Sequence, residues 1–256
     1  MYAAVLARVS NLGLLAAVVA AWWGGSTYLL DQGTRALLPP PQDIVAAAWE
    51  LARSGDLWRH FRDSIRREFV AFAWATSAIP LGIAMGWWKS VEDQVDPLVE
   101  VLRPIPPLAW IPLSILWFGV GDTQNQFIIF LGCFFPILVN TISGVKGVEP
   151  NLVRAARCLG AGEARILWHV VLRAALPQII TGVRVGLGVG WMALVAAELV
   201  GANTGLGFLI NDARTVLRTD QVIVGMATIG LVGLGIDRAI RGAVARLMPW
   251  SGAMRR

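Results

Sequence analysis

The fold is decided by residues 178–200, which read QIITGVRVGLGVGWMALVAAELV. Only Arg184 and Glu198 carry charge in this stretch, and the remainder is almost entirely apolar. A helix needs about 20 such residues to cross the hydrocarbon core of a bilayer. We therefore expect a membrane-spanning helix here.

The composition of the whole chain agrees with a membrane protein. The 256 residues are 56% hydrophobic and 15% charged, and the mean hydropathy is +0.61. A soluble domain usually carries about 25% charged residues. Twelve tryptophans against two tyrosines also fit a protein whose aromatic side chains sit near the lipid headgroups.

Five further apolar stretches are typical of membrane spans, at residues 9–30, 69–88, 108–120, 126–142 and 221–236. A short amphipathic helix is expected at 43–53, before the second span. Several of these spans fall below about 20 residues, which packed helices tolerate. The fold class predicted is an all-α membrane protein with about six transmembrane helices, in a single domain covering residues 1–256.

The basic residues orient this arrangement. Net charge is +5, but the Lys and Arg residues lie between the apolar spans without forming a cationic helix face, so no nucleic-acid partner is expected. With both termini in the cytoplasm, the inner segments hold roughly twice as many Lys and Arg residues as the outer ones, as the positive-inside rule requires. The basic cluster at 59–67, placed on the outer side, is the exception.

No catalytic or metal site is predicted. Cys133 lies in a span and Cys158 in a polar loop, so neither a disulfide nor a metal site is expected. His60 and His169 are far apart and have no carboxylate or Cys at ligand spacing. The sequence contains no phosphate-binding loop, so the chain is not expected to hydrolyse ATP itself.

The segment between the fourth and fifth spans, at about 143–177, is too polar to enter a bilayer. Residues 151–159 and 162–172 each show helical spacing of apolar residues, and Gly160-Ala161-Gly162 separates them. Two short helices lying along a membrane face fit this pattern, and their small residues permit close approach by another protein. A solvated hairpin without a partner is the alternative.

Residues that line a translocation path or gate are predicted on the fifth span. Its glycines recur at every fourth position and share one helical face, which suits close helix packing or leaves room for a solute. Glu198 is expected to pair, to act in a gate or to meet a binding protein, and Arg184 to reach the inner interface. The candidates are Gly182, Gly186, Gly190, Trp191 and Glu198.

Four motifs carry a resemblance to a known family. They are RPIPPLAWIPL at 103–113, WFGVG at 117–121, GLGVGW at 186–191 and LVAAEL at 194–199. With LLPPP at 37–41 and GLGF at 205–208, the sequence resembles permeases of binding-protein-dependent ABC importers, in the nitrate, sulfonate and taurine branch. The likeness covers about residues 37–250 and is strongest to the taurine permeases.

The polar segment also resembles that family's loop, which reads Glu-Ala-Ala, three residues, Gly, nine residues, Ile-x-Leu-Pro. Ala155-Ala156 and Gly160 match the loop, as does the later Leu176-Pro177. Arg154 stands where the family has glutamate and Val170 where it has isoleucine, so an acidic contact at 154 is not implied.

The resemblance implies a type I ABC importer permease fold with a cytoplasmic coupling hairpin between the fourth and fifth spans. It implies a bacterial inner-membrane homodimer in lipid, two ATPase subunits that hold ATP and Mg²⁺, and a periplasmic or lipid-anchored substrate-binding protein. The solute implied is a small anion, with taurine or another alkanesulfonate favoured over nitrate or bicarbonate. The residues implied in ATPase docking are Ala155, Ala156, Cys158, Leu159, Gly160, Ala161 and Gly162.

A six-span secondary transporter or channel is the rival reading, and a membrane-embedded enzyme is a third. The former needs ionisable groups deep in the spans and inverted repeats. The latter needs clustered His, Asp or Glu at membrane depth. Neither pattern is evident in the sequence.

Overall fold

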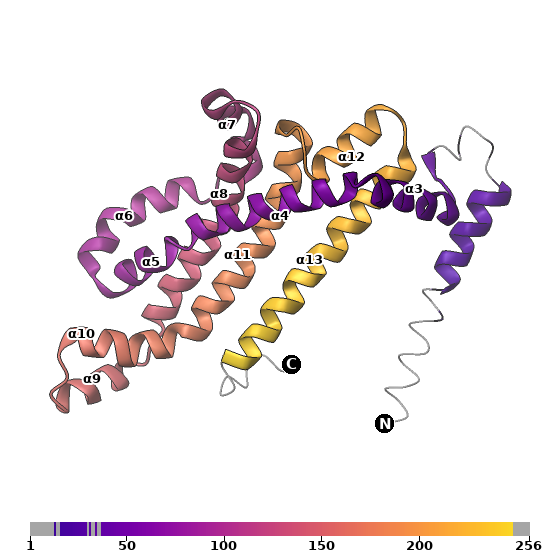
Figure 1. Cartoon of the computed structure of the whole chain (residues 1–256). Helices are drawn as coiled ribbons and strands as arrows, with labels where there is room; N and C mark the ends of the chain where they lie inside the picture. Colours follow the sequence, from indigo (N-terminus) through magenta and orange to yellow (C-terminus); the bar gives the residue numbers. More distant parts are fainter. Residues whose placement is uncertain (1–12, 14–15, 30, 32–33, 35–36, 248–256) are drawn as a thin grey trace.

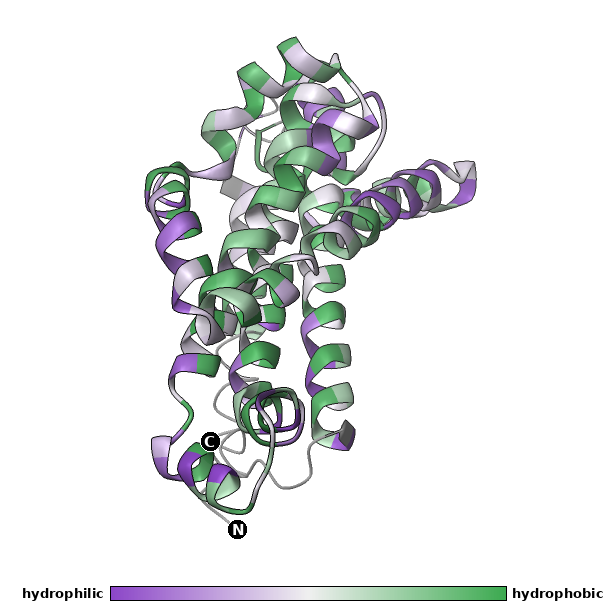
Figure 2. Cartoon of the chain, turned by 90° about the vertical axis from the view of Figure 1, so that its left-hand side faces the viewer, coloured by the Kyte–Doolittle hydropathy of each residue, from purple (hydrophilic) through white to green (hydrophobic). Residues whose placement is uncertain are grey.

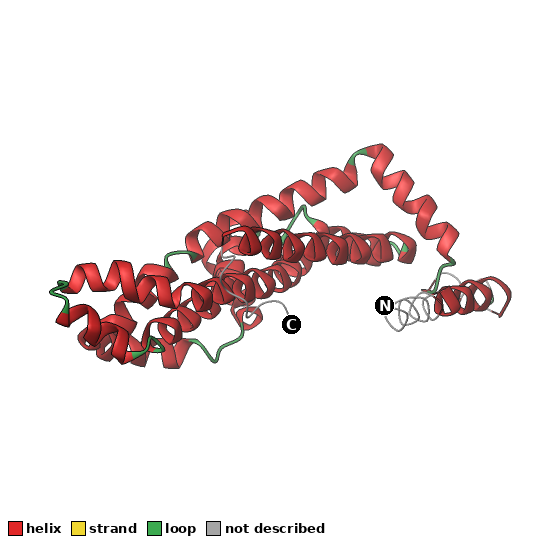
Figure 3. Cartoon of the chain, turned by 90° about the horizontal axis from the view of Figure 1, so that it is seen from below, coloured by secondary structure: helices red, strands yellow, loops and turns green. Residues whose placement is uncertain are grey.

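The computed structural model describes residues 13, 16–29, 31, 34 and 37–247. Within these residues every regular element is a helix and no strand occurs (Figure 3). The predicted all-α fold class is confirmed.

The helices follow one another with short connections. After a helical stretch at 16–24, they are η1 (Gly25–Leu29), α3 (Pro41–Ser54), α4 (Asp56–Ala75), α5 (Ala78–Trp87), α6 (Lys89–Leu102), η2 (Pro107–Trp110), α7 (Ile111–Phe118), α8 (Asp122–Lys146), α9 (Pro150–Cys158), α10 (Glu163–Ile166), η3 (Leu167–Val171), α11 (Leu172–Gly201), α12 (Leu206–Thr215) and α13 (Thr219–Leu247). The amphipathic helix predicted at 43–53 is α3.

Four helical segments among the described residues are long and apolar enough to cross a membrane. They are Asp56–Trp87, Asp122–Lys146, Glu163–Gly201 and Thr219–Arg246. The pair Lys89–Leu102 and Pro107–Phe118 adds a fifth if it is counted as one broken span. Part of the span predicted at 9–30 lies outside the described residues, so the total of six stays a prediction.

Two predicted spans belong to longer helical arrangements. The second, at 69–88, lies in a helical segment that begins at Asp56, so the basic cluster at 59–67 is part of α4 and not a loop. Arg59 and Arg62 are exposed and pair within α4, whereas Arg66 and Arg67 pair with acidic groups of other elements. The third, at 108–120, corresponds to η2 and α7, which pass for a membrane crossing only together with α6, and the two parts meet at a bend of 81°. The cause is the proline run at the junction, where three residues lack a backbone N–H: Pro104, Pro106 and Pro107.

The long helices α8, α11 and α13 lie side by side and roughly parallel, and α4 crosses them (Figure 1). Helices α9 and α10 lie at one end of this bundle, and α7 and α12 lie at the other. Hydrophobic residues run along the long helices, whereas hydrophilic residues are interspersed in the turns and short helices at the ends (Figure 2).

Glycines on α11 bring its backbone close to α8. Gly182, Gly186 and Gly190 are all buried on the face toward α8. A Cβ atom at Gly182 would lie 2.6 Å from the Cβ of Asn140, and one at Gly186 would lie 2.9 Å from the backbone oxygen of Cys133. Contacts of that length cannot form, so the two helices pack this closely only because these positions lack side chains.

We therefore expect Gly186→Ala to lower the melting temperature of the purified protein, with a loss of about 1–3 kcal/mol from overpacking. This loss should outweigh the better helix propensity of alanine. The matched control is Gly188→Ala on the same helix, where an added Cβ meets no atom within 4 Å. Equal melting temperatures for the two variants would contradict the packing described here.

Candidate functional site

A polar hairpin, residues 147–166, joins α8 to the helical segment Glu163–Gly201. Helix α9 begins with Pro150 at its first position and ends at Cys158. The Gly160 N–H donates to the backbone oxygen of Arg157 at 2.9 Å, and the Ala161 N–H donates to that of Ala156 at 3.1 Å. These bonds end the helix through Gly160, whose φ of +80° favours glycine.

The second arm of the hairpin differs from the prediction. Residues 162–172 do not form a separate short helix, because the helix that starts at Glu163 continues as one segment to Gly201. Arg157 and Glu163 form an ion pair with an N–O distance of 2.9 Å, which ties α9 to the start of this segment. The hairpin is therefore an extension of a membrane-spanning helix.

The predicted docking residues divide into two groups. Ala156 and Ala161 are partly buried and pack against the cluster that contains Val145, Ile166 and Val171. The others are exposed: Ala155, Cys158, Leu159, Gly160 and Gly162. The first group holds the hairpin to the bundle, and the second remains open to a partner.

An apolar face is exposed on α9. Leu159 is 88% exposed and Leu152 is 48% exposed. Leu159 directly follows α9 as its capping residue, and its N–H donates to the Ala155 oxygen, so it continues the face of Leu152 and Ala155 two turns further on. Trp168, in η3, is a further exposed apolar residue of this end, at 66%. Leu152 and Trp168 were not among the predicted docking residues, although the spacing of Leu152 and Leu159 was a usable signal.

Trp191 connects α11 to α13. Its side chain is buried, and its indole N–H donates to the backbone oxygen of Ile229 at 3.3 Å. Gly233 lies against the same ring, since a Cβ there would be 3.1 Å from the indole nitrogen. Trp191 and the three α11 glycines therefore make contacts within one chain, and their role in a translocation path stays a prediction.

A buried polar cluster surrounds Glu198 near the other end of α11. We call Ser64, Arg67, Asp122, Glu198 and Thr204 the Glu198 cluster. Arg67 donates to Glu198 at 2.7 Å and to Asp122 at 2.7 Å, and Ser64 donates to Glu198 at 2.9 Å. The side chains of Arg67 and Glu198 are 3% and 0% exposed. The pairing expected for Glu198 is present, and its partner comes from the basic cluster at 59–67.

The same cluster holds the loop between α11 and α12. Arg67 donates to the side-chain oxygen of Thr204 at 2.8 Å, and the Gly207 N–H donates to Glu198 at 2.9 Å. The Gly205 N–H donates to His60 at 3.0 Å. Helices α4, α11 and α12 are thus joined through buried hydrogen bonds, whose loss would leave unpaired polar groups.

Glu68 lies next to Arg67 and was not among the residues predicted from the sequence. It is 1% exposed, and neither of its carboxyl oxygens has a hydrogen-bond partner among the described residues. It sits against Gly190, where an added Cβ would be 2.9 Å from one carboxyl oxygen. The helical spacing of Ser64, Arg67 and Glu68 with Ala71 marks one buried face of α4, and this was the signal available.

The cysteines and histidines form no metal site in the part of the chain that the structure describes. Cys133 is buried and Cys158 is exposed, and both are free. No group of three or more His, Cys, Asp or Glu side chains that could hold a metal ion occurs among these residues.

Arg67→Ala should destabilise the protein by about 3–5 kcal/mol, because it leaves Glu198 buried and unpaired. Thermal unfolding of the purified protein measures this. Arg66→Ala is the matched control, since Arg66 is next in the chain and pairs with Asp122, but its side chain is 59% exposed. Its loss should cost about 1 kcal/mol or less. A similar loss of stability in both variants would show that the buried pair does not hold the helices together.

Residues 78–247 match a family described as binding-protein-dependent transport system inner membrane component. The taurine transport system permease protein TauC of Escherichia coli is 43% identical over 221 residues, covering 84% of this chain and 80% of that protein. A putative ABC transporter permease of Methanocaldococcus jannaschii is 51% identical over 194 residues, covering 75% and 73%. The nitrate import permease NrtB of Synechocystis is 35% identical over 187 residues, covering 73% and 68%.

A solved structure has the same fold. The inward-facing MetNI methionine ABC transporter matches with a TM-score of 0.55 and 22% identity, covering 75% of this chain and 96% of that chain. That likeness concerns the fold alone. The resemblance to ABC importer permeases of the nitrate, sulfonate and taurine branch is confirmed by the sequence relatives. The chain belongs to the family of binding-protein-dependent transport system inner membrane components.

Proposed function

We propose that this chain is the non-catalytic permease subunit of an ATP-driven importer that carries a small sulfonate, taurine in first place, into the cytoplasm. The observation that carries the proposal is the exposed apolar face of α9, which lies at the end of a helical segment that also reaches the Glu198 cluster. A surface of this kind suits docking of an ATPase subunit. The similarity to TauC supports taurine, and the similarity to NrtB makes nitrate the alternative.

The helical segment Glu163–Gly201 connects the hairpin to the Glu198 cluster and can transmit a movement from one to the other. At about 1.5 Å per residue, its 39 residues reach about 58 Å. Packing of Ala156 and Ala161 on the apolar cluster that includes Ile166 holds α9 to its start, and Glu198 is held near its end by Arg67. A displacement of α9 by ATPase subunits that close on ATP is therefore passed along the segment to α4 and α12.

The partners follow from this assignment. ATP and Mg²⁺ bind to the ATPase subunits, and this chain itself needs no cofactor. A second copy of the chain completes the path, so the complex is a homodimer in lipid. The substrate-binding protein, periplasmic or lipid-anchored, docks at the end of the bundle formed by α7 and α12, opposite the hairpin (Figure 1).

We place the hairpin and both termini in the cytoplasm of a multi-pass inner-membrane protein. Lys146, Arg154, Arg157 and Arg165 gather at the hairpin end of the bundle. The cluster at 59–67 lies in the polar first half of α4, where Arg66 and Arg67 pair with Asp122. It remains the exception to the positive-inside rule, which counts Lys and Arg close to the ends of spans.

Leu159→Asp should reduce co-purification of the ATPase subunit by about tenfold or more, because it places a charge on the apolar docking face. Gly160→Asp should act in the same direction, with backbone strain added. Leu159 is so exposed that the fold does not depend on it. Val216→Asp, which is 62% exposed beyond the end of α12, is the control and should retain the ATPase. If Leu159→Asp and Gly160→Asp both assemble and transport as the unmodified chain does, the docking surface is elsewhere.

We expect proteoliposomes that contain this chain, its ATPase and its binding protein to take up radiolabelled taurine. This uptake should require Mg-ATP on the side of the membrane where the ATPase lies. Uptake should stop when the ATPase cannot hydrolyse ATP. Uptake driven by an imposed proton or sodium gradient without the ATPase would favour the secondary transporter instead. Uptake of nitrate without any of taurine would move the solute assignment to the nitrate relatives.

A further inference from the structure

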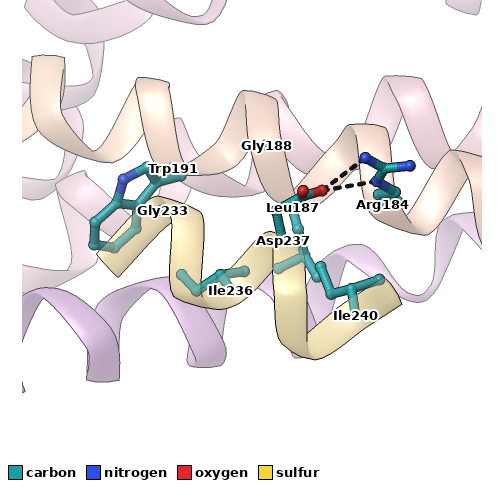
Figure 4. A pocket seen from close by; sticks show the side chains of 8 residues that line it. All are labelled: Arg184, Leu187, Gly188, Trp191, Gly233, Ile236, Asp237 and Ile240. Carbon is teal, nitrogen blue, oxygen red and sulfur yellow. Dashed lines mark hydrogen bonds and ion pairs between the residues drawn. The ribbon is translucent and has the colours of Figure 1, made fainter. Parts of the chain in front are cut away.

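Arg184 lies on α11, in the first third of the apolar stretch 178–200 and so toward the hairpin end of the bundle. A charged side chain inside an apolar stretch is costly unless it pairs, reaches the interface or faces a cavity. Figure 4 shows Arg184 on α11 reaching across to Asp237 on α13. Two nitrogens of Arg184, Nε and Nη2, each lie 2.8 Å from the same oxygen, Oδ1 of Asp237.

A second guanidinium shares this carboxylate. Nε of Arg241 lies 2.7 Å from the other oxygen, Oδ2 of Asp237. Two positive groups on one negative group leave an excess of one positive charge. A guanidinium has five N–H donors, and no hydrogen bond to another described residue engages the remaining donors of Arg184 or Arg241. The site is therefore positively charged and has unused donors.

These donors face open space. A cavity of about 370 Å³ lies between α11 and α13, with both arginines and Asp237 in its wall and Val185 and Val244 as apolar lining. A smaller cavity of about 70 Å³, which reaches Trp191, also has Arg184 and Asp237 in its wall (Figure 4). The larger cavity has room for a small organic anion. Guanidinium groups bind oxyanions through paired, charge-assisted hydrogen bonds.

We propose that Arg184 and Arg241 form a binding station for the sulfonate head of the solute in the cavity between α11 and α13. Asp237 holds both guanidinium groups in place, and the excess charge attracts the anion. The valines contact the short alkyl part of the solute. This assignment rests on the proposed function, in that the chain carries a small sulfonate.

The test measures equilibrium binding of radiolabelled taurine to the purified permease–ATPase complex in phosphatidylcholine nanodiscs, without the binding protein. The unmodified complex should bind taurine saturably, and Arg241→Gln should bind it about tenfold or more weakly, since one charged donor is lost. The Arg241 side chain is 64% exposed, so the substitution leaves the packing intact. Arg241→Lys, which keeps the charge but not the fork of donors, should lie between the two.

Arg238→Gln is the matched control, because it removes the same charge one position from Asp237 on an exposed residue that lines neither cavity. It should bind taurine as the unmodified complex does. Equal binding by the Arg241→Gln and Arg238→Gln complexes, or no saturable binding by the unmodified complex, would overturn the station. Displacement of taurine when phosphatidylglycerol is added to the nanodiscs would assign the site to a lipid phosphate and would also overturn it.

The uptake assay separates this failure from that of the proposed function. If the unmodified importer accumulates taurine with ATP while Arg241→Gln does not change taurine binding, only the station is lost. If the unmodified importer accumulates no sulfonate, the proposed function fails as well.

Discussion

Close contact between α8 and α11 is the constraint on which the remaining features depend. A lipid environment offers no hydrophobic drive for two apolar helices to associate, so their contact rests on packing of small residues. Gly182, Gly186 and Gly190 supply it on α11, and a Cβ at Gly132 of α8 would lie 3.3 Å from the Cα of Gly190. With α11 held in this way, its two ends are fixed relative to the bundle. The hairpin extends from one end and the Glu198 cluster surrounds the other.

The charged groups of the long helices are arranged in two different ways. In the Glu198 cluster, the buried Arg67 is shared by Glu198 and Asp122, and buried hydrogen bonds extend the cluster into the loop before α12. At the α11–α13 contact, one carboxylate, Asp237, is shared by Arg184 and Arg241, whose side chains are partly exposed beside a cavity. The first arrangement is suited to holding helices together. The second leaves positive charge available to an anion.

The sequence was sufficient wherever the information was local. Uninterrupted apolar runs predicted the cores of α8, α11 and α13, and the glycine spacing predicted one packed face of α11. The sequence was insufficient where a contact with a residue far along the chain decides the structure. The cluster at 59–67 looked like a loop because Asp122 is 55 positions and Glu198 is 131 positions from Arg67. The partner of Arg184 is 53 positions away, and the bend before α7 depends on how its prolines pack.

The central claim is that the hairpin end of the bundle carries the ATPase, and native Cys158 tests it most directly. Cys158 is exposed on the hairpin and the chain's other cysteine, Cys133, is buried. A photoreactive cross-linker attached to Cys158 in membranes that contain the assembled importer would report its nearest neighbour. We predict an adduct with the ATPase subunit, and none from a cysteine introduced at Val216 in a Cys158→Ser background. An ATPase adduct at Val216, with none at Cys158, would contradict the account.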